Sequence, residues 1–415
     1  MDSLQINQRL IMTPGPVLVD PRVSQAMSNQ ILGQFDPDFT AIMNDTMALI
    51  RQSFATKNRW AFPVDGTSRA GLEAVVSSIV CPGDSVLVPS IGRFGDLFVE
   101  LAQRAGGVVH TVSAPWGTVL AQADIIAAID QYRPKVVCMV HGETSTGRLQ
   151  PLDKIGAAVH QYGGFLVVDA VASYMGAPVL VDQWQIDAAV GGAQKCLAIP
   201  AGITPITFND RFAAEINQRK RVEQGVRTSQ DHLSAAPLIT SNYLDLTQLQ
   251  DYWSPRRLNH HTEATAAVYG LHEGLRLALD EGLNARYARH LQVHQALNTA
   301  LSALGLTIYG AGDHEMPMVT CVQIPAGLDG EAFRSQLLAQ FGVEISSSFG
   351  SLQGKIWRIG TMGYVAQKPF ILKFIALFGA ALLQAGVPVD LKAGLDAVLD
   401  AFAPKSAPQL RQVNA

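Results

Sequence analysis

An acid and an amine follow two short apolar runs near the middle of the chain. The run at residues 165–168 stops at Asp169, and residues 187–190 lead through two glycines to Lys195. Each run, bounded by a turn, predicts a strand buried on both faces of a parallel sheet, and open α/β sheets bind ligands at the carboxyl ends of such strands. A carboxylate for a pyridinium nitrogen and a lysine for a Schiff base are the groups that pyridoxal phosphate chemistry needs most.

Both residues also have ordinary structural explanations, since an Asp commonly caps the turn after a strand and a Lys after two glycines is commonly just exposed. A second segment strengthens the chemical interpretation. Residues 66–71, reading GTSRAG, form a small-residue turn before a helical pattern. The free N–H groups and the positive end of such a helix stabilise a phosphate. The turn is neither a GxGxxG nor a Walker motif.

Two further segments contain candidate substrate ligands. Gly15 lies in the rigid turn Thr13-Pro14-Gly15-Pro16, which could cross a site and offer a backbone N–H group. Arg358 lies in an otherwise apolar strand pattern, and its guanidinium needs a partner. A substrate carboxylate or an internal Asp or Glu would each fill that need.

The surrounding pattern alternates strands with helices. Strands are predicted at residues 85–89, 108–112, 135–140, 165–168 and 204–208, and helices at 38–54, 94–104, 121–132 and 155–162. This alternation predicts an α/β fold with a mostly parallel sheet covered by helices on both faces. We predict a large domain with an N-terminal arm over residues 1–264 and a smaller C-terminal α+β domain over residues 265–415. The basic run at residues 219–221 is most simply a solvated helix face.

Composition narrows the function classes. The 415 residues are 48% hydrophobic and 16% charged, which is typical of a globular protein with a large core. A net charge of -4 gives no reason to expect nucleic acid or a membrane surface as partner. The cysteines at 81, 138, 196 and 321 are widely spaced, against disulfides and structural zinc. We find no leader pattern and no long apolar run, which predicts a cytoplasmic location.

Two histidine pairs raise the question of a metal. His260 and His261 are adjacent, so their side chains diverge, and the sequence shows no third ligand. His290 and His294 share a helix face, but Leu291 stands where a zinc protease would need Glu. We predict that both pairs are structural and that the protein holds no metal.

In this order, the segments resemble the fold-type I, class V pyridoxal phosphate aminotransferases, in particular the alanine/serine–glyoxylate aminotransferase group. The resemblance runs from the Thr13 turn to Arg358-Ile359-Gly360 and is most specific in residues 141–147, reading HGETSTG, then at Val168-Asp169 and Gln194-Lys195.

The resemblance implies a role for each matching residue. Lys195 would form the Schiff base and carry protons, and Asp169 would keep the pyridine nitrogen protonated. The phosphate would be held by Thr67, Ser68, Arg69 and Gln194, with Thr262 reaching in from the partner of a homodimer whose sites lie at the subunit interface. Of the remaining residues, Thr144 would lie near the ring hydroxyl, Phe94 would stack on the ring where the group usually has Trp, and Arg358 would bind the substrate α-carboxylate.

Two departures concern the substrate. Asn259 replaces the Tyr that usually precedes His-His-Thr, and Gln34 replaces the usual residue in the loop at 31–37. Two amides suit a ureido group, which has a carbonyl and N–H groups. This resembles the (S)-ureidoglycine–glyoxylate aminotransferases of purine breakdown, which pass an amino group to glyoxylate and give glycine. Asn259 would then act from the neighbouring subunit.

The sequence allows three other functions. The amides could merely fill surface positions in an alanine/serine–glyoxylate (or pyruvate) aminotransferase, which would use another small amino donor and 2-oxo acid acceptor. A lyase of the cysteine desulfurase type would need a Cys in a mobile Gly/Ser-rich loop, and none of the four cysteines lies in an evident one. A non-catalytic protein that binds pyridoxal phosphate would keep the same motifs.

Overall fold

The computed structural model describes residues 4–229, 231 and 234–403. Within these residues the main sheet has seven strands in the order β2-β10-β9-β8-β5-β3-β4. The strands are β2 (Trp60–Asp65), β3 (Ser85–Ser90), β4 (Val108–Ser113), β5 (Val136–Val140), β8 (Phe165–Asp169), β9 (Ala188–Val190) and β10 (Ile203–Phe208). Only β10 runs against its two neighbours. The α/β fold with a mostly parallel sheet is therefore confirmed, with one antiparallel strand that the sequence pattern did not indicate.

The register of the sheet brings the candidate residues to one edge. Val140, Asp169 and Val190 lie opposite one another at the carboxyl ends of β5, β8 and β9. Asp65, at the end of β2, pairs with Ile203 at the same edge. The loops that follow these parallel strands thus meet above the sheet, where α/β enzymes bind ligands.

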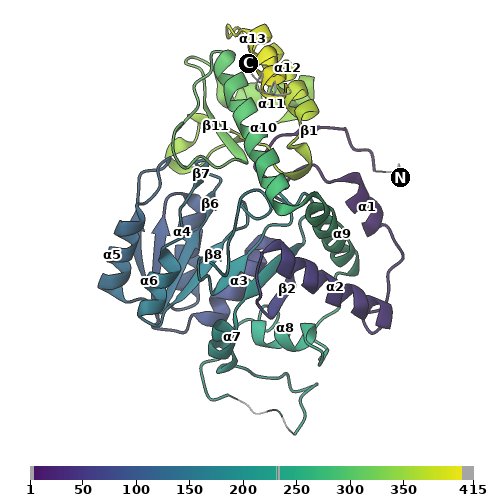
Figure 1. The fold of residues 1–415 in the computed structure, drawn as a ribbon, viewed down its shortest axis with the longest axis vertical. Coiled ribbons are helices and arrows are strands. Elements are labelled where there is room, and N and C mark those ends of the chain that lie inside the picture. The colour runs from purple at the N-terminus through teal and green to yellow at the C-terminus, as the bar shows by residue number, and fades with distance from the viewer. Residues whose placement is uncertain (1–3, 230, 232–233, 404–415) are drawn as a thin grey trace, which may run out of the picture.

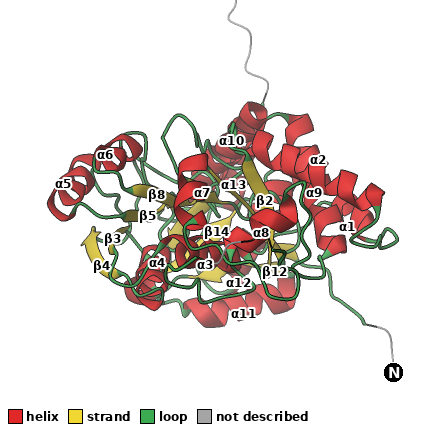
Figure 2. Ribbon diagram, turned by 90° about the horizontal axis from the view of Figure 1, so that it is seen from below, coloured by secondary structure: helices red, strands yellow, loops and turns green. Residues whose placement is uncertain are grey.

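Helices cover both faces of the sheet (Figure 2). One packed group contains α3 (Ser68–Ile79), α4 (Arg93–Arg104), α7 (Asp210–Asn217) and α8 (Leu246–Trp253). On the opposite face α5 (Gln122–Tyr132) packs on α6 (Ile155–Gln161), while α1 (Pro21–Met27) and α2 (Pro37–Ser53) pack on α9 (Thr265–Glu281). Helix α2 is capped at its N-terminus, because the Asp36 carboxylate accepts a hydrogen bond from Asp38 N at 2.8 Å and Pro37 takes the first helical position.

A second core lies beyond the main sheet, at the top of Figure 1. Its helices are α10 (Leu283–Ala303), α11 (Gly330–Phe341), α12 (Lys368–Gln384) and α13 (Leu391–Ala401), around a sheet of β11 (Val319–Gln323), β14 (Ile356–Gly360) and β13 (Ser346–Ser347). Strand β1 (Leu10–Ile11) pairs with β12 (Val343–Glu344), so the N-terminal arm joins this core. Short elements are β6 (Gly142–Glu143), β7 (Arg148–Leu149), and the 3-10 turns η1 (Gly350–Leu352) and η2 (Gly363–Val365). The domain boundary at 264/265 stays a prediction; the apolar face of α9 packs in the main core.

The interpretation of residues 219–221 as a solvated helix face is wrong. Helix α7 ends at Asn217, and Arg219 is buried with its guanidinium donating to the carbonyls of Ser77, Ser78 and Val80 at 2.8–3.1 Å. The five N–H groups of a guanidinium allow Arg219 to bond the free carbonyl groups at the end of α3. The periodicity of the sequence does not reveal such a contact. In the part of the chain described, no helix is both long and apolar enough to cross a membrane.

Candidate active site

Lys195 lies at the end of a tightly packed turn after β9. A Cβ on Gly192 would lie 2.1 Å from the Val171 carbonyl oxygen, so only glycine allows this approach. The amine donates a hydrogen bond to the Pro14 carbonyl, and a Cβ on Gly15 would lie 2.6 Å from Lys195 Nζ. The turn predicted around Gly15 therefore crosses directly over the lysine.

The amine of Lys195 is easily deprotonated. Burial, together with the positive charge of Arg358, lowers its pKa to about 8. A larger share of Lys195 is therefore neutral near physiological pH than for an exposed lysine, and the neutral amine is the form that attacks a carbonyl carbon.

Asp169 is the buried acid at the end of β8. Its carboxylate accepts a hydrogen bond from Val171 N at 2.8 Å. Burial raises its pKa to about 7, with a further contribution from the Glu143 carboxylate, while the charge of Lys195 acts in the opposite direction. Asp169 and Lys195 thus influence each other electrostatically from adjacent strand ends.

The start of α3 lies beside the lysine turn. Gly66 has a φ of +119° and lets the chain turn from β2 into the helix. The helix-start residue Thr67 makes no side-chain cap, while Ser68 Oγ donates to Gln194 Oε1 at 3.1 Å. The structure therefore brings Ser68 and Gln194 together. The side chains of Thr67 and Arg69 are exposed, and the uncapped N–H groups suit a phosphate.

Glu143 organises the loop at 141–147, and the sequence analysis assigned it no role. Its buried carboxylate accepts from Ser145 N at 3.0 Å, Ser145 Oγ at 2.6 Å and Phe94 N at 3.0 Å. It thereby ties the loop after β5 to the first turn of α4, where Phe94 is half-buried. A glutamate within a run of small polar residues was the signal available in the sequence.

Arg358 is held by carbonyl groups. Its Nε donates to Ser347 O at 2.7 Å and its Nη1 to Thr144 O at 3.0 Å, and the guanidinium lies 4.6 Å from the ring centre of Phe349. Burial lowers its pKa to about 10. Among the described residues no Asp or Glu forms an ion pair with it, so the internal acid considered from the sequence is not found. Thr144 is buried and contributes its carbonyl here.

The two amides that depart from the family pattern meet in the fold. Gln34 Nε2 donates to Asn259 Oδ1 at 2.9 Å, although the residues are far apart in the sequence. Gln34 Oε1 has no hydrogen bond within the described residues. The pair thus retains an acceptor on Gln34 and the Asn259 amide N–H groups as donors. Thr262, three residues further on, has an exposed side chain.

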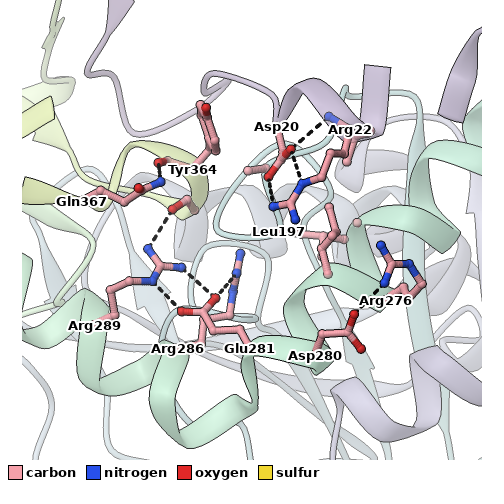
Figure 3. Close-up of a pocket in the computed structure, with 15 residues that line it drawn as sticks. Asp20, Arg22, Leu197, Arg276, Asp280, Glu281, Arg286, Arg289, Tyr364 and Gln367 are labelled. Carbon is pink, nitrogen blue, oxygen red and sulfur yellow. Dashed lines mark hydrogen bonds and ion pairs between the residues drawn. The ribbon is translucent and has the colours of Figure 1, made fainter. Parts of the chain in front are cut away.

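Behind the lysine turn lies a cavity of about 580 Å³ (Figure 3). Arg286 donates to the carbonyl of Cys196, next to Lys195, and to Glu281 at 2.7 Å. Arg289 also bonds Glu281, and donates to the carbonyls of Gly363 and Ala366 at 3.0 and 2.7 Å. Arg286 and Arg289, which line this cavity, thus connect the lysine turn to the second core.

Together the buried lysine of lowered pKa, the buried acid and the uncapped helix start fit the aldehyde, ring nitrogen and phosphate of pyridoxal phosphate. Fold and site thus define a fold-type I pyridoxal phosphate enzyme.

Comparison with known proteins narrows this class. Residues 22–357 match the family model for class-V aminotransferases. An (S)-ureidoglycine–glyoxylate transaminase of Bacillus subtilis (strain 168) is 54% identical over 396 residues, which cover 95% of each chain. An alanine–glyoxylate aminotransferase of Drosophila melanogaster is 31% identical over 395 residues, covering 94% of this chain and 96% of that protein. The chain belongs to the class V aminotransferases and depends on pyridoxal phosphate.

Solved structures agree with this assignment. The ureidoglycine–glyoxylate aminotransferase of Bacillus subtilis superposes with a TM-score of 0.92 at 52% identity, covering 97% of this chain and all 100% of that one. An alanine–glyoxylate aminotransferase of Nostoc sp. gives 0.86 at 34% identity, with 92% and 97% covered. A cysteine desulfurase of Thermococcus onnurineus, at 17% identity and a TM-score of 0.72, shares the fold alone.

Proposed function

We propose that this aminotransferase takes the amino group of (S)-ureidoglycine and passes it to glyoxylate, giving glycine. The observation that carries the proposal is the hydrogen-bonded pair of Gln34 and Asn259, two amides at the positions where the sequence departs from the alanine–glyoxylate pattern. The 54% identity to the Bacillus subtilis ureidoglycine enzyme supports it.

Lys195 and Asp169 would do the proton chemistry. Bound pyridoxal phosphate supplies an electron sink for the substrate Cα. Lys195, whose pKa is lowered to about 8, would act as the base that takes the proton from the substrate Cα and then as the acid that gives it up again. Asp169, buried at the end of β8, would hold the ring nitrogen protonated. Phe94 and Thr144 would contact the ring, from α4 and from the loop after β5.

The phosphate would lie at the start of α3. There the backbone N–H groups, Thr67, Ser68, Arg69 and Gln194 would surround the phosphate, and the helix dipole favours a dianion at this end.

We further propose a homodimer in which Thr262 of the partner subunit completes this phosphate site. Phe35 and Ile6 are 76% and 78% exposed, on the loop that carries Gln34 and on the N-terminal arm. We take these exposed apolar side chains, on two separate segments, as support for an interface that covers them. We also propose that the enzyme acts in the cytoplasm, as expected from the sequence.

Arg358 would bind the substrate α-carboxylate. Three of its five N–H groups remain after the bonds to Ser347 and Thr144, which is enough for a two-pronged contact. Gly15, across Lys195, would offer its backbone N–H from the other side.

The amide pair would select the donor. Gln34 Oε1 can accept from a ureido N–H group, and Asn259 can donate to the ureido carbonyl. An alkyl side chain such as that of alanine would leave these groups unpaired, at about 1–3 kcal/mol for each. Asn259 and Gln34 would act from one subunit on the site of the other, beside Thr262.

A donor screen tests the proposal. Ureidoglycine, alanine and serine are mixed singly with the yellow enzyme, and the rate of cofactor bleaching is compared in wild type and in Asn259→Tyr. We expect wild type to react fastest with ureidoglycine and the variant to lose that preference. Faster reaction of wild type with alanine would instead support an alanine–glyoxylate aminotransferase, and an unchanged ranking in the variant would remove Asn259 from the specificity argument.

A further inference from the structure

Three potential metal ligands meet at the carboxyl end of β2. Asp65 ends the strand, and His261 and Glu263 come from the segment before α9. His261 Nε2 lies 3.3 Å from Asp65 Oδ2 and 3.8 Å from Glu263 Oε2, and one ligand atom of each residue falls within 4.8 Å of the other two. The side chains of Asp65, His261 and Glu263 are 10%, 9% and 1% exposed. The fold thus supplies the further ligands that the sequence did not show for His261.

The hydrogen bonds around His260 fix the tautomer of His261. His260 Nε2 lies 3.1 Å from the Asn242 carbonyl, which can only accept, so this nitrogen carries a hydrogen. The Nδ1 atoms of His260 and His261 lie 2.8 Å apart. In neutral His260 the Nδ1 atom must accept, so His261 Nδ1 donates and His261 Nε2 keeps a lone pair. That lone pair faces the two carboxylates.

The buried carboxylate of Glu263 lacks a well-formed hydrogen bond. Within the described residues neither of its oxygens nor the Tyr252 hydroxyl makes a hydrogen bond of good geometry, and the polar groups around the carboxylate are His261 Nε2 at 3.8 Å, Asp65 and Tyr252 itself. A buried carboxylate next to another carboxylate and a nitrogen lone pair is strongly unfavourable unless a proton or a cation lies between them.

We propose that Asp65, His261 and Glu263 bind a divalent transition-metal ion. Ligand atoms about 2.0–2.2 Å from one ion are separated by about 3–4 Å, and the distances from His261 Nε2 to Asp65 and Glu263, 3.3 and 3.8 Å, fall in that range. One imidazole with two carboxylates suits Zn²⁺ or Mn²⁺ better than Mg²⁺ or Ca²⁺. His260 would orient the His261 ring from the outer shell. The rings of Tyr252 and Tyr243, centred 4.8 and 5.5 Å from that of His261, would shield the ion.

The position suggests what the ion does. Asp65 directly precedes the Gly66 turn into α3, while His261 and Glu263 flank Thr262. The ion would therefore hold two segments together. One is the Gly66 turn, which the proposed function places at the phosphate of this subunit's cofactor. The other carries Thr262, which the proposed function places at the phosphate of the partner's cofactor. This role rests on the proposed function; binding of the ion does not.

Metal binding by the tag-free, full-length holoenzyme tests the site. The protein is dialysed against a chelator and then titrated with ZnCl₂, MnCl₂ or MgCl₂, and bound metal per chain and Tm are measured. We expect one equivalent of Zn²⁺ or Mn²⁺ per chain and a Tm higher by a few degrees, with Mg²⁺ binding more weakly. Glu263→Gln keeps the side-chain volume and should weaken binding by on the order of tenfold or more. Glu315→Gln is the matched control, because Glu315 pairs with His294 at 2.7 Å outside the cluster.

Two outcomes would overturn the proposal. If the chelated protein takes up neither Zn²⁺ nor Mn²⁺ and its Tm stays constant, the cluster is neutralised by protons or by the partner subunit. If both Glu263→Gln and the second variant, His261→Gln, bind metal like wild type, the ion lies elsewhere. Donor preference is measured on the same preparations, so a failed ureidoglycine assignment with intact metal binding is recognised separately.

Discussion

Replacing Arg358 by lysine tests how the substrate is anchored. Lysine keeps the positive charge and about the length of the side chain but loses the planar fork that makes two parallel bonds to a carboxylate. It also cannot keep both bonds to Ser347 and Thr144, which fix the guanidinium in the wild type. We expect the variant to fold, because β14 pairs through its backbone with β11 and β13.

The expected loss follows from the contact removed. A hydrogen-bonded charge pair out of water is worth about 2–4 kcal/mol, and each 1.36 kcal/mol is tenfold in rate. The value of kcat/KM for the amino donor should therefore fall by about 30-fold to 1,000-fold in Arg358→Lys. The measurement is the rate of cofactor bleaching as a function of donor concentration.

The charge of Arg358 has a separate, measurable effect. It helps to lower the pKa of Lys195, so Arg358→Gln should raise that pKa above about 8, while Arg358→Lys should leave it close to the wild-type value. The pH dependence of the rate at which the apoenzyme takes up pyridoxal phosphate reports the pKa of Lys195.

Arg334→Lys is the control for both measurements, since Arg334 also donates to a backbone carbonyl in the second core but pairs with Glu331. Wild-type kcat/KM in Arg358→Lys would refute the carboxylate assignment.

Further predictions concern the groups around the lysine. Lys195→Ala should bind the cofactor without a Schiff base and lose turnover by about 10²-fold to 10⁴-fold or more, as followed by absorbance and product formation. In the apoprotein the pKa of Asp169 is about 7 instead of 3.8, so the folded state holds a proton there that the unfolded chain has lost. Stability should therefore fall as pH rises from about 4 to 7, and Asp169→Asn should flatten this slope in urea unfolding at pH 5 and 7.5. Gly15→Ala places a methyl group against Lys195 at a φ of +106° and should slow cofactor uptake by the apoenzyme, with thermal stability measured alongside. Arg286→Met should lower Tm and leave donor ranking unchanged, because it removes the bond to Cys196 but touches no substrate.

Much of the fold could be predicted because most strands of the main sheet are buried on both faces. Continuous apolar runs such as residues 136–140 and 165–168 have few alternatives to a parallel sheet. The antiparallel direction of β10 could not be predicted, since an apolar run carries no sign of its direction. The buried role of Arg219 was missed for a similar reason: it depends on carbonyls at the far end of α3, and basic runs are ordinarily solvated.

Some residues of the candidate site could be predicted from the sequence and others could not. Lys195 and Asp169 could be found because Asp169 ends β8, Lys195 lies in the turn that follows β9, and strand ends of a parallel sheet share an edge. Glu143 acts through bonds to Phe94 on another helix, which spacing along the chain does not encode. The meeting of Gln34 with Asn259 is likewise tertiary, since it joins the loop before α2 to the segment before α9.

The two halves of the site are joined through the first turns of α10. Arg286 there bonds the main core next to Lys195, and Arg289, on the same helix, holds the turn at Gly363. The rest of α10 packs its apolar face, including Val293 and Leu297, in the second core. Since Glu281 binds both guanidinium groups, the start of the helix is also tied to the end of α9. Arg358 links the two cores in the same way, because its strand β14 belongs to the second core while its guanidinium donates to the Thr144 carbonyl after β5.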